Sequence, residues 1–184
     1  MTPPTKFAHA VFGTHRYREM VRFYETVFES TIQSQSEKYT FMTYDEEHHR
    51  HAIVNLGPAP EGHVDRQPGA AGLRHLAYTW DTIPDLMSVY RRVRDELGVR
   101  PVISTKHGPT LSMYYEDPDG NRLEFQVDLL DPEQSNEFMA TEAFAANPLG
   151  EPFDPEELCR GLDAGEPIED HVLRSDQPRV SIPV

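Results

Sequence analysis

The fold is decided by one stretch of the sequence, which reads His107-Gly-Pro-Thr-Leu-Ser-Met-Tyr-Tyr-Glu-Asp-Pro-Asp-Gly-Asn-Arg-Leu-Glu-Phe-Gln-Val-Asp128. Leu111–Glu116 and Arg122–Val127 alternate as strands do, and Asp117–Gly120 between them has turn residues in turn order, so the stretch predicts a β-hairpin. Leu123, Phe125 and Val127 share one face of the second strand and can enter a core. Glu124 lies on the other face, where an inward carboxylate needs a partner.

Length and composition restrict the class of protein. A chain of 184 residues, 38% of them hydrophobic, can build one domain with a full core or two very small ones. We find no apolar run of membrane-spanning length and no signal peptide near Met1. The one cysteine, Cys159, cannot form an internal disulfide, so we expect a reducing cytoplasm.

The negative charge is concentrated near the C-terminus. Residues 129–184 hold thirteen Asp and Glu against three Arg, which accounts for −10 of the net charge of −14. This acidity argues against nucleic acid or an anionic membrane as a partner, because a polyanion would be repelled. Residues 129–184 are therefore interpreted as a solvated, acidic extension.

The rest of the chain repeats one order of elements, strand, helix and three strands. The first copy comprises a strand over Lys6–Gly13 that suits burial on both sides, an amphipathic helix over Arg16–Phe28, and strands over 31–35, 39–44 and 51–56. The second comprises a strand over 73–80, a helix capped by Asp81 or Thr82, and strands over 101–105, 111–116 and 121–127. Matching His9 to His75 gives an offset of 66 residues. We expect an α+β protein in which two βαβββ modules line one cavity.

The expected boundaries follow from this repeat. The first module takes residues 1–57, a linker rich in Gly and Pro takes 58–70, the second module takes 71–128, and the acidic extension takes 129–184. All four parts are expected to form one structural domain.

The repeat also predicts a metal site. His9 and His75 lie on the first strands of the two modules, and Glu124 lies on the last strand of the second. Two imidazoles and one carboxylate form the facial triad of non-haem iron(II) sites, which leaves positions open for substrate and dioxygen. The residue that mirrors Glu124 in the first module is expected to be Ile53, which supplies no fourth ligand.

The same segments resemble the vicinal oxygen chelate superfamily, and within it the type I extradiol ring-cleaving dioxygenases, from about Phe7 to Asp128. The matching segments are Lys6-Phe7-Ala8-His9-Ala10-Val11, Leu73-Arg74-His75-Leu76-Ala77 and Ser112-Met113-Tyr114, followed by Pro118 and Glu124. The resemblance implies the vicinal oxygen chelate fold, a single-domain form of the enzyme, and Fe²⁺ on His9, His75 and Glu124, with Mn²⁺ as the alternative metal. It also implies a catechol-type substrate and O₂.

Three further residues match positions that handle the substrate in that family. The resemblance implies that His51 is the acid–base residue, and we expect it to titrate near neutral pH. It implies that Tyr114 and His107 donate hydrogen bonds to the substrate oxygens.

Two alternatives remain on the same scaffold. One is a metal-dependent lyase or isomerase of the glyoxalase I or fosfomycin-resistance type. The other is a metal-free protein that sequesters a drug, as bleomycin-resistance proteins do. For any of these, we expect a homo-oligomer, a dimer or higher.

Overall fold

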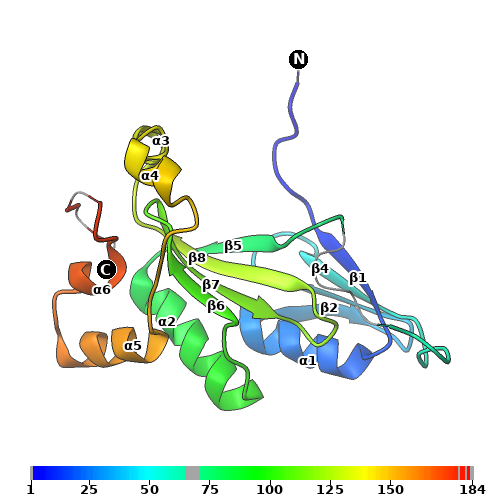
Figure 1. The fold of residues 1–184 in the computed structure, drawn as a ribbon. Coiled ribbons are helices and arrows are strands. Elements are labelled where there is room, and N and C mark those ends of the chain that lie inside the picture. The colour runs from blue at the N-terminus through cyan, green and yellow to red at the C-terminus, as the bar shows by residue number, and fades with distance from the viewer. Residues whose placement is uncertain (1, 65–70, 178, 181, 183–184) are drawn as a thin grey trace. The chain divides into compact units, whose positions relative to one another are not determined.

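The computed structural model describes residues 2–64, 71–177, 179–180 and 182, and it divides the chain into two compact units (Figure 1). Unit 1 comprises Met1–Ala71 and Asp117–Asn121, and unit 2 comprises Gly72–Glu116 and Arg122–Val184. Of the linker expected over 58–70, residues 65–70 lie outside the described ranges, and residues 58–64 contain neither helix nor strand.

Unit 1 is a four-stranded sheet with one helix. Its elements are β1 (Ala10–Thr14), α1 (Tyr17–Phe28), β2 (Thr31–Gln35), β3 (Tyr39–Thr43) and β4 (His51–Asn55), and the strand order is β1-β4-β3-β2. Strands β1 and β4 are parallel, as a strand–helix–strand connection allows, and the other pairs are antiparallel. Helix α1 is amphipathic, and the side chains along one of its faces are buried. These are Met20, Val21, Phe23, Tyr24, Val27 and Phe28.

The first strand differs from its expectation. It begins at Ala10 instead of Lys6, and Phe7 is 66% exposed. Val11 is 58% exposed, so β1 is buried on one face only. The expectation of burial on both sides was wrong because the apolar pattern of a short strand cannot show whether a second layer covers it.

Unit 2 repeats the arrangement. Its elements are β5 (Leu76–Trp80), α2 (Ile83–Arg92), the π-helical turn η1 (Val93–Leu97), β6 (Ile103–Lys106), β7 (Thr110–Glu116) and β8 (Arg122–Asp128). The strand order is β5-β8-β7-β6, with β5 and β8 parallel. Thr82 caps α2 by accepting a hydrogen bond from the backbone of Asp85 at 3.2 Å, as predicted. The predicted hairpin is confirmed, since β7 and β8 pair in register from Thr110↔Asp128 to Glu116↔Arg122.

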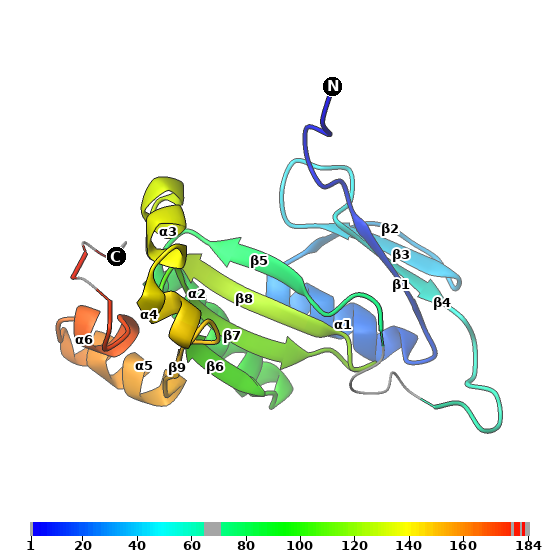
Figure 2. The same cartoon turned by 45° about the horizontal axis from the view of Figure 1, so that its top comes forward.

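The described part of residues 129–184 is not merely a solvated extension, so that interpretation was wrong. It contains α3 (Pro132–Met139), α4 (Glu142–Ala146), β9 (Glu151–Pro152), α5 (Pro155–Ala164) and α6 (Glu169–Val172), and β9 pairs with β6 at the sheet edge. Helix α5 lies beside α2 (Figures 1 and 2) and buries Leu158 and Cys159. The acidic composition did not indicate this packing, because a short helix can pack against a neighbour through only a few apolar residues at helical spacing.

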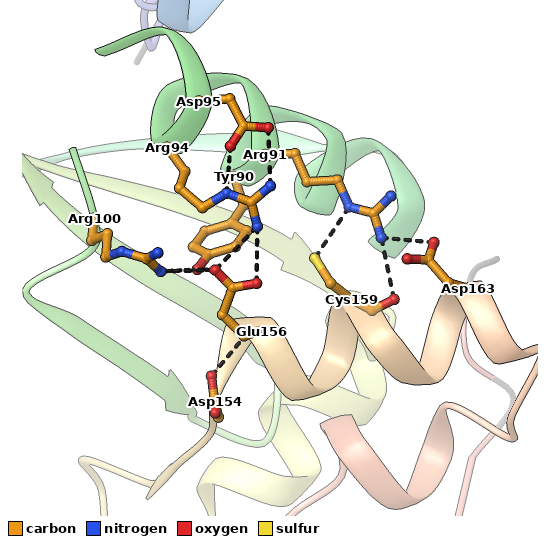
Figure 3. Close-up of polar contacts among 9 residues, drawn as sticks. All are labelled: Tyr90, Arg91, Arg94, Asp95, Arg100, Asp154, Glu156, Cys159 and Asp163. Carbon is orange, nitrogen blue, oxygen red and sulfur yellow. Dashed lines mark hydrogen bonds and ion pairs between the residues drawn. The ribbon is translucent and has the colours of Figure 1, made fainter. Parts of the chain in front are cut away.

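Ion pairs fix α5 to α2 (Figure 3). Glu156 accepts hydrogen bonds from Arg94, Arg100 and the hydroxyl of Tyr90 at 2.8 to 3.0 Å. These bonds, with that from Arg100 as the largest cause, lower the pKa of Glu156 to about 2. Two acidic residues of this segment, Glu156 and Asp163, therefore pair with Arg94, Arg100 and Arg91 of the second module. Within the described ranges every helix is too short or too polar to span a lipid bilayer.

Candidate functional site

The site of unit 2 occupies the face of the sheet that α2 does not cover. Leu123, Phe125 and Val127 of β8 are fully buried on the helix side, as the sequence predicted. Because side chains alternate along a strand, Glu124 between them points to the other face. The register places it directly opposite Tyr114 of β7 and beside Ala77 of β5.

Glu124 has two partners on this face. It is 6% exposed, and its Oε2 lies 3.0 Å from Nε2 of His75, which comes immediately before β5. Its Oε1 accepts a hydrogen bond of 2.8 Å from the hydroxyl of Tyr114. The inward carboxylate is thus satisfied from two neighbouring strands.

His107 extends this network. It lies in the tight loop between β6 and β7, and its Nε2 is 3.0 Å from the Tyr114 hydroxyl. The backbone carbonyl of Pro148 also interacts with this imidazole and raises the pKa of His107, against the larger effect of burial. A tyrosine hydroxyl has one proton, so it donates to Glu124 or to His107 but not to both at once. The Tyr114 hydroxyl therefore offers one proton, which either the carboxylate or the imidazole can accept in a hydrogen bond.

Burial sets the protonation states of the two middle residues. It is the largest cause that raises the pKa of Tyr114, and the hydrogen bond to Glu124 raises it further. Burial also lowers the pKa of His107, against the opposing charge of Glu124. Near neutral pH, Tyr114 is therefore a phenol and His107 is mostly a neutral imidazole that can accept a proton.

The donor atoms of His75 and Glu124 fit one divalent ion. Two ligands on adjacent corners of an octahedron, each about 2.1 Å from the ion, are roughly 3 Å apart. The His75 Nε2 to Glu124 Oε2 distance is 3.0 Å. Among the described residues no group of three or more His, Cys, Asp or Glu side chains is close enough together to hold a metal, so the triad remains a prediction.

The third predicted ligand, His9, belongs to unit 1. It is exposed, comes immediately before β1, and stacks on the ring of His49 with centroids 4.4 Å apart. The structure thus brings together four of the six predicted site residues, namely His75, His107, Tyr114 and Glu124. The other two predicted site residues, His9 and His51, belong to unit 1.

His51 lies in the core of unit 1. It is 1% exposed, and its ring is 4.8 Å from the rings of Tyr24 and Phe28 of α1, centroid to centroid. Burial, with a smaller contribution from the charge of Arg50, lowers the pKa of His51 to about 3. The expectation that His51 titrates near neutral pH was therefore wrong. Its role as acid–base residue remains a prediction.

The register of unit 1 corrects the residue that mirrors Glu124. With His9 matched to His75, Val11 matches Ala77, and these pair with Ala52 and Glu124 respectively. The mirrored residue is therefore Ala52 and not Ile53, which is fully buried. Both residues are apolar, so the pattern of the sequence could not distinguish them. The conclusion that this position supplies no fourth ligand is unaffected.

The Pro148 carbonyl at His107 could not be predicted from the sequence. Pro148 lies between α4 and β9, in the segment that was interpreted as a solvated extension. A backbone carbonyl has no signature in an amino-acid sequence, and only the pairing of β9 with β6 brings this part of the chain to the site.

The chain is similar to known proteins in both sequence and structure. The family model described as Glyoxalase/Bleomycin resistance protein/Dioxygenase superfamily matches residues 6–125. Biphenyl-2,3-diol 1,2-dioxygenase 2 of Rhodococcus globerulus is 39% identical over 170 residues, which cover 92% of this chain and 87% of that protein. Biphenyl-2,3-diol 1,2-dioxygenase 3 of the same organism is 36% identical over 176 residues, which cover 95% and 91%.

Solved structures show the same fold at low sequence identity. A glyoxylase/bleomycin resistance protein/dioxygenase domain from Frankia sp. EAN1pec has a TM-score of 0.54 at 15% identity, over 68% of this chain and 99% of that one. A fosfomycin resistance protein from Mesorhizobium loti has a TM-score of 0.51 at 20% identity, over 75% and 100%. The expected fold is confirmed, and the chain belongs to the Glyoxalase/Bleomycin resistance protein/Dioxygenase superfamily.

Proposed function

We propose that the chain is an extradiol dioxygenase that opens the ring of a catechol-type substrate with O₂. The family name covers glyoxalases and drug-resistance proteins as well, so the family alone does not select a reaction. Two relatives that match more than nine tenths of the chain are named biphenyl-2,3-diol 1,2-dioxygenases, and this similarity favours ring cleavage over the other reactions of the family. The observation that carries the proposal is the pairing of Glu124 with His75 in a network that reaches His107 through Tyr114.

The enzyme uses a divalent metal, held by His75 and Glu124 with His9 as the third ligand. Iron(II) is the proposed metal, with manganese(II) as the alternative, because imidazole and carboxylate accept both. When bound, the metal supplies Lewis acidity and a path for electrons between the ring and dioxygen. The 3.0 Å separation of the His75 and Glu124 donor atoms supports this ligand pair.

Tyr114 and His107 handle protons at the substrate oxygens. Nε2 is the ring nitrogen of His107 that faces the Tyr114 hydroxyl, at 3.0 Å, and in a neutral imidazole that is protonated on Nδ1 it carries a lone pair. Nε2 can accept the proton that a catechol hydroxyl loses, directly or through the Tyr114 hydroxyl, and return it when the O–O bond breaks. The raised pKa of Tyr114 keeps it a hydrogen-bond donor to the developing oxyanion.

His107 and His51 compete for the acid–base role. The resemblance assigns it to His51, whereas the lowered pKa and 1% exposure of His51 argue for His107. Substitution of each residue by glutamine separates them. We expect His107→Gln to lower kcat on the order of a hundredfold and His51→Gln to leave kcat nearly unchanged in folded protein. The reverse result would return the role to His51.

The experiment that tests the proposal measures oxygen uptake. Anaerobically purified full chain is loaded with ferrous iron and mixed with a panel that includes biphenyl-2,3-diol and unsubstituted catechol. We expect oxygen consumption with a yellow ring-opened product, and loss of both in Glu124→Ala and His75→Ala. Bound iron without oxygen uptake across the panel would refute the proposed reaction.

Two further features belong to the proposal. We expect a homo-oligomer, which sedimentation of the full chain would reveal and a purely monomeric protein would contradict. We also expect a reducing cytoplasmic location, in agreement with Cys159, which is a free and buried thiol.

A further inference from the structure

The loop that carries His107 is enclosed by residues that follow the hairpin. The loop runs from His107 to Pro109 between β6 and β7. Each of its three carbonyl groups accepts a hydrogen bond from a later part of the chain. The donors are Arg174 Nη1 to His107 at 3.2 Å, Gln177 Nε2 to Gly108 at 3.0 Å, and the backbone of Leu129 to Pro109 at 2.8 Å.

The loop is also held by close packing. Gly108 has φ +103, a conformation that favours glycine, and an added Cβ would lie 2.3 Å from Cε1 of Phe138 in α3. An added Cβ at Gly150 would lie 2.1 Å from the carbonyl oxygen of Lys106 and 3.0 Å from Cα of His107. The backbone at His107 therefore cannot move without displacing α3 or the turn before β9.

Arg174 occupies the centre of this enclosure. Its side chain is fully buried, and a buried guanidinium requires partners for its donors. Nε and Nη2 donate to the two carboxylate oxygens of Asp176 at 2.8 and 2.7 Å, and the guanidinium lies 5.4 Å from the ring centroid of Phe138. Nη1 donates to His107 and also to the carbonyl of Asn147 at 2.8 Å. One cation thus joins the His107 loop to the turn that begins at Asn147.

The link that Arg174 makes between the His107 loop and the Asn147 turn affects the surroundings of the His107 imidazole. Pro148, which follows Asn147, supplies the carbonyl that hydrogen-bonds the His107 imidazole. The turn is tied internally, since the side chain of Asn147 donates to the carbonyl of Gly150 at 2.9 Å and accepts from its backbone at 3.1 Å. The hydrogen bond made by one ring nitrogen decides which nitrogen carries the proton.

We infer that Arg174 is a positioning residue for the proposed reaction: by holding the carbonyls of His107 and Asn147 on one guanidinium, it keeps the His107 ring in one orientation, with Nε2 toward Tyr114. The catalytic consequence rests on the proposed function, whereas the effect on the ring does not. Nε2 is then the nitrogen that exchanges protons with Tyr114 and the substrate. Residues 129–177 are part of the active site on this account.

The test uses Arg174→Lys in the full chain, with Arg174→Met as the more severe change. Lysine keeps the positive charge beside Asp176 but lacks the planar fork that reaches two carbonyls and a carboxylate together. Arg179→Lys is the matched control, because Arg179 lies in the same segment, is exposed, and pairs with Asp170. Gln177→Ala is a milder variant that removes the bond to Gly108 and retains Arg174. Circular dichroism and thermal unfolding identify the folded variants.

The first readout does not depend on activity. Protein labelled with ¹⁵N-histidine and freed of paramagnetic metal reports the tautomer of each imidazole by NMR, and His107→Gln identifies the signals of His107. We expect a single tautomer of His107 in the wild type and in Arg179→Lys, and a mixture in Arg174→Lys and, to a smaller extent, in Gln177→Ala. Unchanged His107 signals in folded Arg174→Lys would overturn the inference.

The second readout is a double-mutant cycle on kcat. We expect Arg174→Lys to lower kcat on the order of tenfold with little change in KM, and to cause no further loss when His107 is already glutamine. A loss of the same factor in both backgrounds would show that Arg174 does not act through His107. If the wild type turns over no catechol, the proposed function fails, and the NMR readout alone then decides the inference.

Discussion

Tyr114→Phe tests the proton network with the smallest possible change. It removes one oxygen atom, the one that donates to Glu124 at 2.8 Å and contacts His107 at 3.0 Å. The ring and the backbone of β7 are retained. Tyr115→Phe is the matched control, because Tyr115 is the next residue and points to the buried face, where its hydroxyl lies 4.0 Å from the sulfur of Met113.

The expected magnitudes follow from these contacts. A hydrogen bond to a charged acceptor contributes about 1.5 to 3 kcal/mol, and the Tyr114 hydroxyl is only partly buried, so we expect a loss near the lower value in the free energy of unfolding. We expect kcat to fall on the order of a hundredfold, because the hydroxyl lies between the substrate oxyanion and His107 and can donate to either. For Tyr115→Phe we expect kcat within about twofold of the wild type, since its hydroxyl lies outside the network.

The assay combines oxygen uptake at saturating catechol with urea unfolding of each iron-loaded variant. Uptake gives kcat, and unfolding shows whether a loss of activity comes from loss of folded protein. Wild-type kcat in folded Tyr114→Phe would refute the role of the hydroxyl. An equal loss in Tyr115→Phe would show that the effect reports the packing of β7 and not the network.

Three further predictions concern stability. The pKa of His51 is about 3 in the folded state, whereas a histidine in the unfolded chain has a pKa near 6.5. Between pH 7 and pH 5 the unfolded state therefore binds a proton that the folded state does not, and the unfolding free energy of the wild type should fall about 2 kcal/mol more than that of His51→Phe. An equal dependence on pH for both proteins in urea unfolding would contradict the buried neutral imidazole. Glu156→Gln should lower the unfolding free energy at pH 7 by about 1 kcal/mol and remove the stability that the wild type loses between about pH 4.5 and 2, whereas exposed Glu157→Gln should match the wild type in both respects. Gly150→Ala, with φ +83 and its Cβ against the Lys106 carbonyl, should cost about 2 kcal/mol in thermal unfolding, and an unchanged melting temperature would mean that the turn before β9 can move.

Alternation along the strands made the second module predictable. Leu123, Phe125 and Val127 identified the face that packs on the helix, and this in turn placed Glu124 on the open face with His75 and Tyr114 nearby. The turn chemistry of Asp117–Gly120 fixed the hairpin, since Gly120 has φ +78 and its backbone donates to the carbonyl of Asp117 at 2.9 Å.

Three kinds of feature could not be predicted from the sequence: which face of a strand is covered, the register between strands, and contacts made by main-chain carbonyls. The alternation of β1 does not say which of its faces is covered, and Ala52 and Ile53 are equally apolar, so only strand register distinguishes the one that mirrors Glu124. The environment of His51 depends on four aromatic side chains from other parts of the chain, Phe12, Tyr24, Phe28 and Tyr44. The contacts of Arg174 are with main-chain carbonyls, which leave no pattern among the side chains.

The reaction itself is tested most directly by isotopic oxygen. Iron-loaded wild-type protein is mixed with ¹⁸O₂ and the catechol that it consumes fastest, and the ring-opened product is analysed by mass spectrometry immediately, before exchange with water. We expect both labelled atoms in the product, and we expect Glu124→Gln to form none of it. Incorporation of one atom, or oxygen uptake that persists without Glu124, would contradict the proposed reaction.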